Sequence, residues 1–196
     1  MKLKLFPKSS IFIALILGLS GSGLTLAWCQ SNPLHISPRA TISQKIGDEK
    51  ITIDYGRPGV KNRRIWGELV PYGMAPGIPF SKGKPFPWRG GANENTTISF
   101  SHDVTVQGQA LEAGTYGLHL IPTEKEWTLI FSHNSTSWGS FSYDKAEDAL
   151  RVQVTPIAAS HQEWLRYGFD VLTPRSATVF LHWEKLKVPF EVVLVP

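Results

Sequence analysis

The sequence feature that most constrains the fold is the stretch from Asp103 to Ser132, in which apolar and polar side chains alternate. A two-residue period is the pattern of a strand with one buried face. Two groups of side chains follow it: Tyr116, Leu118 and Leu120, then Trp127, Leu129 and Phe131. Gly108, Gly114 and Pro122 interrupt the stretch at positions that suit tight turns. The stretch therefore predicts two or three short antiparallel strands.

Similar alternation predicts strands elsewhere in the chain, at residues 41–46, 50–55, 92–100, 150–154, 163–172, 177–183 and 188–195. Residues 143–149 are expected to form one helical turn, and residues 156–162 a connection. No segment supplies the long amphipathic helix that a parallel βαβ unit needs. About nine or ten short strands favour a single all-β domain, either an antiparallel sandwich or a partly closed barrel.

The N-terminal segment has the order of a secretory signal: a basic start, the apolar run from Ile11 to Ala27, and small residues near its end. We predict a signal peptide over residues 1–27, either cut after Ala27 or retained as a membrane anchor. Lipidation of Cys29 is an alternative, although Trp28 stands where such a signal has a small residue. Residues 28–37 would then be a tether and 38–196 the domain, located in the periplasm or secreted.

Composition narrows the sources of stability and the classes of partner. Cys29 is the only cysteine, so no intramolecular disulfide forms and stability depends on the apolar core. Without the three lysines of the leader, 17 of the 20 basic residues remain against 16 acidic ones. A nearly neutral mature domain gives no reason to expect a nucleic-acid partner.

The segment from Gly56 to Gly90 differs from the rest, because it has six prolines and no sustained periodicity. Such a long irregular segment in a compact domain is usually functional. Only Arg63 to Val70 is expected to make a short helical turn. The segment contains seven basic residues and a single acid, Glu68.

Arginines in this segment suggest a ligand site, because a guanidinium presents a planar fork of donors to carboxylate, phosphate or sulfate oxygens. We predict that the rim of a cleft binds an anionic or sugar-like ligand through Arg57, Arg63, Arg64, Trp88, Arg89, Asn93 and Glu94. In the alternative interpretation, the guanidinium groups brace the loop through backbone carbonyls and Glu94, or stay solvated. Tryptophans outside the core pattern would either stack on a sugar or cover the ends of the sandwich.

The histidines His119 and His182 are the metal-ligand candidates, since both fall on the less apolar face of their strands. If those strands were neighbours, the two imidazoles with Glu94 or Glu184 would make a three-ligand site. The chain has no H-x-H or H-E-x-x-H spacing, so we expect no metal and no cofactor. It also lacks the G-x-S-x-G nucleophile motif.

Motifs spread over the chain resemble those of a bacterial exported family, Domain of Unknown Function 2911. The matching residues are Tyr55-Gly56-Arg57-Pro58, Lys61-x-Arg63-x-Ile65, Pro71-Tyr72, Trp88-Arg89-x-Gly91-Ala92-Asn93-Glu94-x-Thr96, Ala113-Gly114-Thr115-Tyr116, Tyr143-Asp144, Asp148-Ala149-Leu150-Arg151, Glu163-Trp164-Leu165 and Trp183-Glu184-Lys185-Leu186-x-Val188-Pro189-Phe190. The resemblance runs from about Ser37 to Val195 and implies an envelope-exported, mostly β domain without an assigned activity. Met74 to Pro87 is an insertion relative to the usual family pattern.

These observations favour a non-catalytic binding module of the cell envelope, with the enzyme question open. One alternative is a hydrolase that uses Glu94 with a histidine or a metal ion. Another is a structural partner that adds an edge strand to a second envelope protein. The sequence leaves the oligomeric state open, and it predicts membrane contact only through a retained leader.

Overall fold

A computed structural model of the chain describes residues 36–195. The predicted leader and Cys29 lie outside the described residues. Ten strands are present in this part of the chain, together with the short 3-10 helices η1 (Pro79–Ser81) and η2 (Lys145–Glu147). None of the helical segments described has the length and apolar character of a membrane-crossing helix.

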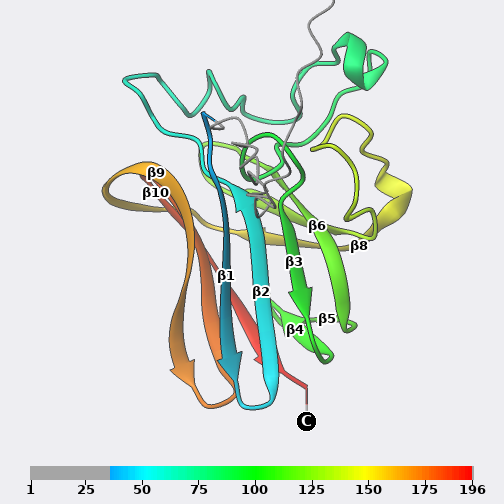
Figure 1. The fold of residues 1–196 in the computed structure, drawn as a ribbon, viewed down its shortest axis with the longest axis vertical. Helices are drawn as coiled ribbons and strands as arrows, with labels where there is room; N and C mark the ends of the chain where they lie inside the picture. Colours follow the sequence, from blue (N-terminus) through cyan, green and yellow to red (C-terminus); the bar gives the residue numbers. More distant parts are fainter. Residues whose placement is uncertain (1–35, 196) are drawn as a thin grey trace, which may run out of the picture. The chain divides into compact units, whose positions relative to one another are not determined.

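The strands form two antiparallel sheets (Figure 1). The larger sheet has the order β1-β2-β3-β6-β7-β8 and the smaller one the order β5-β4-β10-β9. Their bounds are β1 (Arg39–Ile46), β2 (Glu49–Gly56), β3 (Thr97–Phe100), β4 (Val104–Val106), β5 (Gln109–Leu111), β6 (Gly114–Ile121), β7 (Trp127–Ser132), β8 (Asp148–Val154), β9 (Ile157–Thr173) and β10 (Ser176–Leu194). The prediction of an all-β antiparallel domain is confirmed, in its sandwich form, because neither sheet closes into a barrel.

The alternating pattern that predicted β6 and β7 does place its side chains in the core. Leu118 lies opposite Phe131 and Leu120 opposite Leu129, and all four are buried. The other face of these strands is covered as well, since His119 and Ile130 are also buried. The loop over residues 133–147 covers it, with Ser140 hydrogen-bonded to His119. A central strand therefore has two buried faces although only one of them is uniformly apolar.

The hairpin of β9 and β10 is longer than the sequence predicted. Residues 156–162 were expected to be a connection, but β9 already begins at Ile157. Register shifts between His182 and Glu184, and between Glu184 and Leu186, mark bulges in the pairing. Glu184 there has a φ of 53°. A bulge inserts a residue and breaks the two-residue period of the sequence. The sequence pattern therefore predicted two strands, at 177–183 and 188–195, where the structure has the single strand β10.

Four tryptophans close one end of the core between the sheets. Trp127 comes from the larger sheet and Trp183 from the smaller one, while Trp66 and Trp88 come from loops. Trp66 makes edge contacts with the other three, at ring-centroid distances of 5.0 to 5.8 Å, and Trp88 stacks on Trp183 at 6.0 Å. Trp66 and Trp88 thus cover one end of the sandwich, where each indole contributes a large apolar area.

The 56–92 loops lie at this end of the strands, where β1 begins (Figure 1). The predicted insertion is not structureless. Ala75 and Phe86 form an isolated antiparallel bridge, with hydrogen bonds of 2.8 and 3.1 Å, that closes residues 76–85 around η1. We call residues 74–87 the flap. Arg63 to Val70 forms tight turns with an isolated bridge between Trp66 and Val70, and not the expected helical turn.

Candidate functional site

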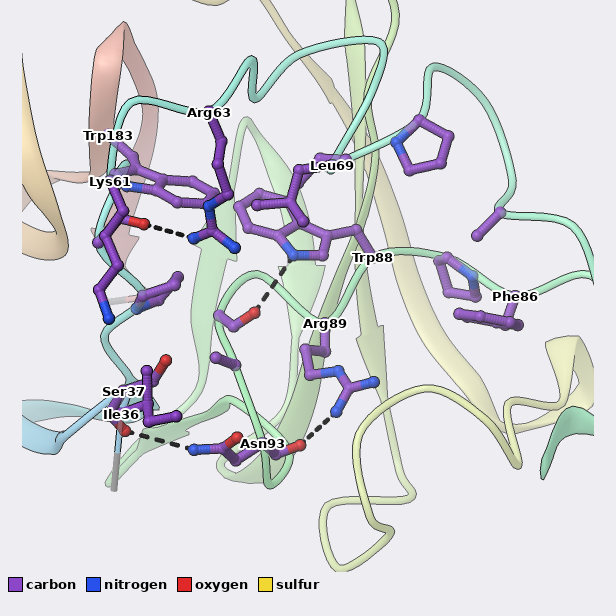
Figure 2. Close-up of a pocket in the computed structure, with 18 of the residues that line it drawn as sticks. Ile36, Ser37, Lys61, Arg63, Leu69, Phe86, Trp88, Arg89, Asn93 and Trp183 are labelled. Atoms are coloured by element: carbon purple, nitrogen blue, oxygen red, sulfur yellow. Dashed lines mark hydrogen bonds between the residues drawn. The ribbon is translucent and has the colours of Figure 1, made fainter. Parts of the chain in front are cut away.

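A pocket of about 500 Å³ lies against the tryptophan cluster, between the 56–73 loop, the flap and the segment 87–93 (Figure 2). Most of its wall is apolar and includes Leu69, Val70, Ile78, Phe86, Trp88 and Trp183. Three cationic side chains, Lys61, Arg63 and Arg89, also line it. None of the described lining residues is acidic. The pocket thus combines an apolar body with a positively charged wall.

The structure brings together four of the seven predicted site residues. Arg63, Trp88, Arg89 and Asn93 all line this pocket, although they come from two separate loop segments. Arg57, Arg64 and Glu94 are not among the lining residues. Each of those three has a partner elsewhere, described below.

Arg63 braces its loop and also lines the pocket, so it fits both interpretations that the sequence left open, loop bracing and ligand binding. Its Nε donates to O of Val60 (3.1 Å) and its Nη2 to O of Gly59 (2.6 Å), so it braces its own turn. Figure 2 shows the guanidinium beside Trp183 and Leu69. Because both acceptors are neutral carbonyls, the positive charge remains available to the pocket.

Arg89 is half-buried at the opposite side of the pocket. Its Nη1 donates a hydrogen bond to O of Asn93. Its Cζ lies 4.6 Å from the ring centroid of Phe141, which is a cation–π geometry. Burial lowers the pKa of Arg89, and the negative charge of Glu94 acts in the opposite direction. Arginine still keeps its proton at any physiological pH.

Trp88 and Asn93 hold the rim in place. Trp88 exchanges backbone hydrogen bonds with Leu120 of β6 (2.8 and 2.7 Å), and its Nε1 donates to O of Gly91 (3.3 Å). Asn93 has a φ of 64° in the left-handed region, and its Nδ2 donates to O of Ser37 (3.3 Å). This bond attaches the start of the domain to the pocket, because Ile36 and Ser37 are lining residues too.

The other three predicted residues hold loops or strands together. Arg57 donates from Nε to O of Leu165 in β9 (3.0 Å). Arg64 forms an exposed ion pair with Glu68 (2.7 Å). Glu94 pairs with Arg39 at the start of β1 (3.3 Å). The structure therefore does not bring all seven side chains to the lining of one pocket, since these three contact other parts of the domain.

Sequence reasoning missed much of the pocket wall. Lys61 is one of the seven basic residues of the 56–90 segment but not of the predicted site, and its Nζ lies 5.7 Å from the ring centroid of Trp164. Ile78 and Phe86 come from the flap, and Trp183 comes from β10. The one available signal was the presence of apolar residues inside a basic, proline-rich loop. Trp183 carried no signal, because its pattern matched that of any core residue.

The structure does not support the hypothesis that His119 and His182 bind a metal ion together. The metal hypothesis required neighbouring strands, but His119 is in β6 of the larger sheet and His182 in β10 of the smaller one. His119 Nδ1 is hydrogen-bonded to Oγ of Ser140 (2.8 Å), and His182 Nε2 donates to O of Ser160 (2.9 Å). Burial, followed by the charge of Arg89, lowers the pKa of His119 to about 4. Within residues 36–195, no three His, Cys, Asp or Glu side chains group as metal ligands would.

Comparison with known proteins yields a family but no relative of established activity. No curated protein and no solved structure matches the chain. The family described as protein of unknown function (DUF2911) has a model that matches residues 37–192. That range begins at the pocket residue Ser37 and ends within β10, so it includes both sheets up to that point and all the pocket-lining residues except Ile36. The match confirms the resemblance that the motifs indicated, and the chain belongs to the DUF2911 family.

Proposed function

We propose that the domain is a non-catalytic binding module for a small anionic ligand with an apolar body. One observation carries the proposal: Lys61, Arg63 and Arg89 line an otherwise apolar pocket in which no described lining residue is acidic. A volume of about 500 Å³ lies in the range of pockets that hold small molecules. The anion could be a carboxylate, phosphate or sulfonate, since arginine binds the oxygens of all three.

Polar contacts in the pocket favour an anion over a neutral sugar. A sugar needs both donors and acceptors, whereas the charged groups of the pocket are donors only. A charge-assisted hydrogen bond is about twice as strong as a neutral one, which makes the cations the main source of specificity. Trp88 and Trp183 would contact the apolar part of the ligand. Their indoles also provide a fluorescence signal for binding.

A pair of fluorescent probes tests the proposal. Anilinonaphthalene sulfonate carries an apolar body and an anion, and N-phenylnaphthylamine carries a similar body without the charge. We expect the sulfonate to bind more tightly. Arg63→Met and Arg89→Met should each weaken it about tenfold, the effect of one charge-assisted hydrogen bond. Neither change should alter the affinity for the neutral probe.

Arg64→Met is the matched control, because it removes the same charge from an exposed side chain outside the pocket. Its affinity for the sulfonate should equal that of the wild type. Thermal unfolding of each variant separates a lost ligand contact from lost structure. Equal binding of both probes, or equal effects at residues 63, 64 and 89, would refute the anion site. A drop in melting temperature without a change in binding would leave bracing as the role of these arginines.

We further propose that the domain acts outside the cytoplasm, since residues 1–27 have the order of a secretory signal. Mass spectrometry of the protein from cell fractions checks this. An N-terminus at Trp28 in the periplasmic fraction would support cleavage, and an intact N-terminus in the membrane fraction would support a retained anchor. Full-length protein in the cytoplasm contradicts the proposal.

A further inference from the structure

We propose that the pocket end of the domain docks on a membrane surface that carries anionic lipids. The proposal does not depend on the identity of the pocket's ligand. It also goes beyond the leader, which was the one membrane contact that the sequence predicted. Three features of the described residues support it: exposed apolar side chains, unpaired lysines beside them, and the point at which the chain enters the domain.

Large apolar side chains are exposed around the pocket. Phe80, in η1 of the flap, is 82% exposed, and Ile36, at the pocket wall, is 77% exposed. Leu69, also a lining residue, and Tyr72 are exposed by more than two fifths. These residues belong to the loops at one end of the strands (Figure 1). Apolar side chains gathered at one place in this way mark an interaction surface more often than single ones do.

Positive charge surrounds the same side chains. Lys82 and Lys84 follow Phe80 at the second and fourth positions, and both are exposed. The salt bridges of the described residues do not include them. Lys61 adds an exposed charge from the neighbouring loop, whereas the charge of Arg64 is paired with Glu68. A cationic surface with inserted aromatic residues is the chemistry that binds anionic lipid headgroups.

The entry point of the chain favours a membrane over another partner. Ile36 and Ser37 line the pocket, so the chain enters the domain at this end. Eight residues, 28–35, separate Ile36 from the apolar run that ends at Ala27. Fully extended, eight residues span at most about 28 Å. A leader retained in the bilayer would therefore keep the pocket end close to the headgroups.

Vesicle co-sedimentation tests the docking surface without the leader. The chain from Leu34 to Pro196 suits this purpose, because it is one compact unit and contains all ten strands and the core. We expect it to bind vesicles of phosphatidylcholine mixed with phosphatidylglycerol more tightly than vesicles of phosphatidylcholine alone. Added salt should weaken the binding, since the lysines act through screened charge.

Substitutions on the flap should reduce the affinity for the mixed vesicles, by an amount that depends on whether an aromatic ring or a charge is lost. Phe80→Ser should weaken binding to the mixed vesicles about tenfold, through the loss of one inserted aromatic ring. Lys82→Gln and Lys84→Gln should each weaken it about fivefold. The exposure of all three side chains means that the domain should remain folded, which circular dichroism checks.

Controls lie at the other end of the strands. Lys45 and Lys50 pair with each other beside the β1–β2 turn, whereas Arg39 and Gly56 pair at the pocket end. Lys45→Gln and Lys50→Gln remove the same charge, and Val195→Ser removes an exposed apolar side chain after β10. These three variants should bind as the wild type does. The proposal fails if the mixed vesicles do not bind, which would leave a protein partner for this surface, or if control and flap variants weaken binding equally.

Discussion

The guanidinium of Arg89 lies over the ring of Phe141, with 4.6 Å between Cζ and the ring centroid. Phe141 also makes an edge contact with Phe86 of the flap, at 5.1 Å between ring centroids. One aromatic side chain from the 133–147 loop thus holds both a pocket cation and the flap. Gly139 completes the arrangement, because an added Cβ there would overlap the Arg89 guanidinium.

Gly139→Ala should therefore lower both the stability of the domain and its affinity for an anionic probe. Gly139 has a φ of 61°, so alanine should lower the free energy of unfolding by about 1 to 2 kcal/mol through backbone strain. It should also push the guanidinium off Phe141 and weaken binding of anilinonaphthalene sulfonate several-fold. Gly108→Ala is the control, with a φ of 75° and nothing within 4 Å of the added Cβ. Urea unfolding and probe titration of both variants give the comparison. An unchanged sulfonate affinity in Gly139→Ala would contradict a ligand role for Arg89.

His119 should make the domain less stable in acid. It is 2% exposed, and its pKa falls from 6.5 to about 4 because of burial and the charge of Arg89. The unfolded chain therefore takes up a proton at a higher pH than the folded one. The stability contribution of neutral His119 is complete above pH 6.5 and is lost as the pH falls toward 4.

The size of the effect should reach about 3 kcal/mol at most, from 1.36 kcal/mol for each unit of pKa difference. Urea unfolding of wild type and His119→Gln at several pH values between 7.5 and 4 measures it. The variant should be less stable at pH 7.5, but its free energy of unfolding should fall less with acid. Parallel pH profiles in the two proteins would show that His119 is not the titrating group.

The tryptophan cluster should respond unequally to phenylalanine. The buried Nε1 of Trp66 has no hydrogen-bond partner among the described residues, whereas Nε1 of Trp183 donates to O of Glu163 (3.2 Å). Trp66→Phe removes an unsatisfied donor, whereas Trp183→Phe removes one of the two hydrogen bonds to O of Glu163, which still accepts from N of Val60 (2.8 Å). Trp183→Phe should therefore lower the free energy of unfolding by about 0.5 to 1.5 kcal/mol more than Trp66→Phe, the net value of one hydrogen bond. Chemical denaturation measures the free energy of unfolding of both variants. A larger loss of stability in Trp66→Phe would mean that the packing of the indole matters more than its hydrogen bonding.

Glu49 should be important for stability at the end of the strands away from the pocket. Its carboxylate, in a residue 1% exposed, accepts the backbone N–H of Ser101 (2.9 Å) and of His102 (2.7 Å) and the hydroxyl of Ser101 (2.9 Å). Glu49→Gln turns one acceptor oxygen into a donor, which should lower the free energy of unfolding by about 1 to 3 kcal/mol.

The exposed Glu112→Gln is the matched control for Glu49 and should leave the melting temperature within experimental error. Neither variant should change the affinity for the probe, because both residues lie outside the pocket lining. A wild-type melting temperature in Glu49→Gln would show that the Ser101 and His102 donors reach other acceptors without a penalty.

How far the sequence predicts the site differs from residue to residue. Arg89 and Trp88 line the pocket, and their sequence signal is local, a guanidinium next to a tryptophan in an irregular loop. Arg57, two residues after Tyr55, is also a loop arginine near an aromatic residue, but it donates to O of Leu165, a residue 108 positions away. The partner, and not the residue type, distinguishes the two arginines. The burial of His119 could not be predicted for the same reason, because its hydrogen-bond partner Ser140 lies in a loop 21 residues further along the chain.

The sequence by itself determined the all-β class, most strand positions and the family, because a two-residue period and short motifs are properties of neighbouring residues. Only the tertiary structure decided that the strands divide into two sheets, that β9 and β10 pass through their bulges, and that Trp66, Trp88, Trp127 and Trp183 meet at one end. Those outcomes depend on contacts between distant segments, whose free energy comes from burial and pairing across the chain. The pocket is one of them, since its cations and its apolar wall come from loops that meet only when the sheets pack.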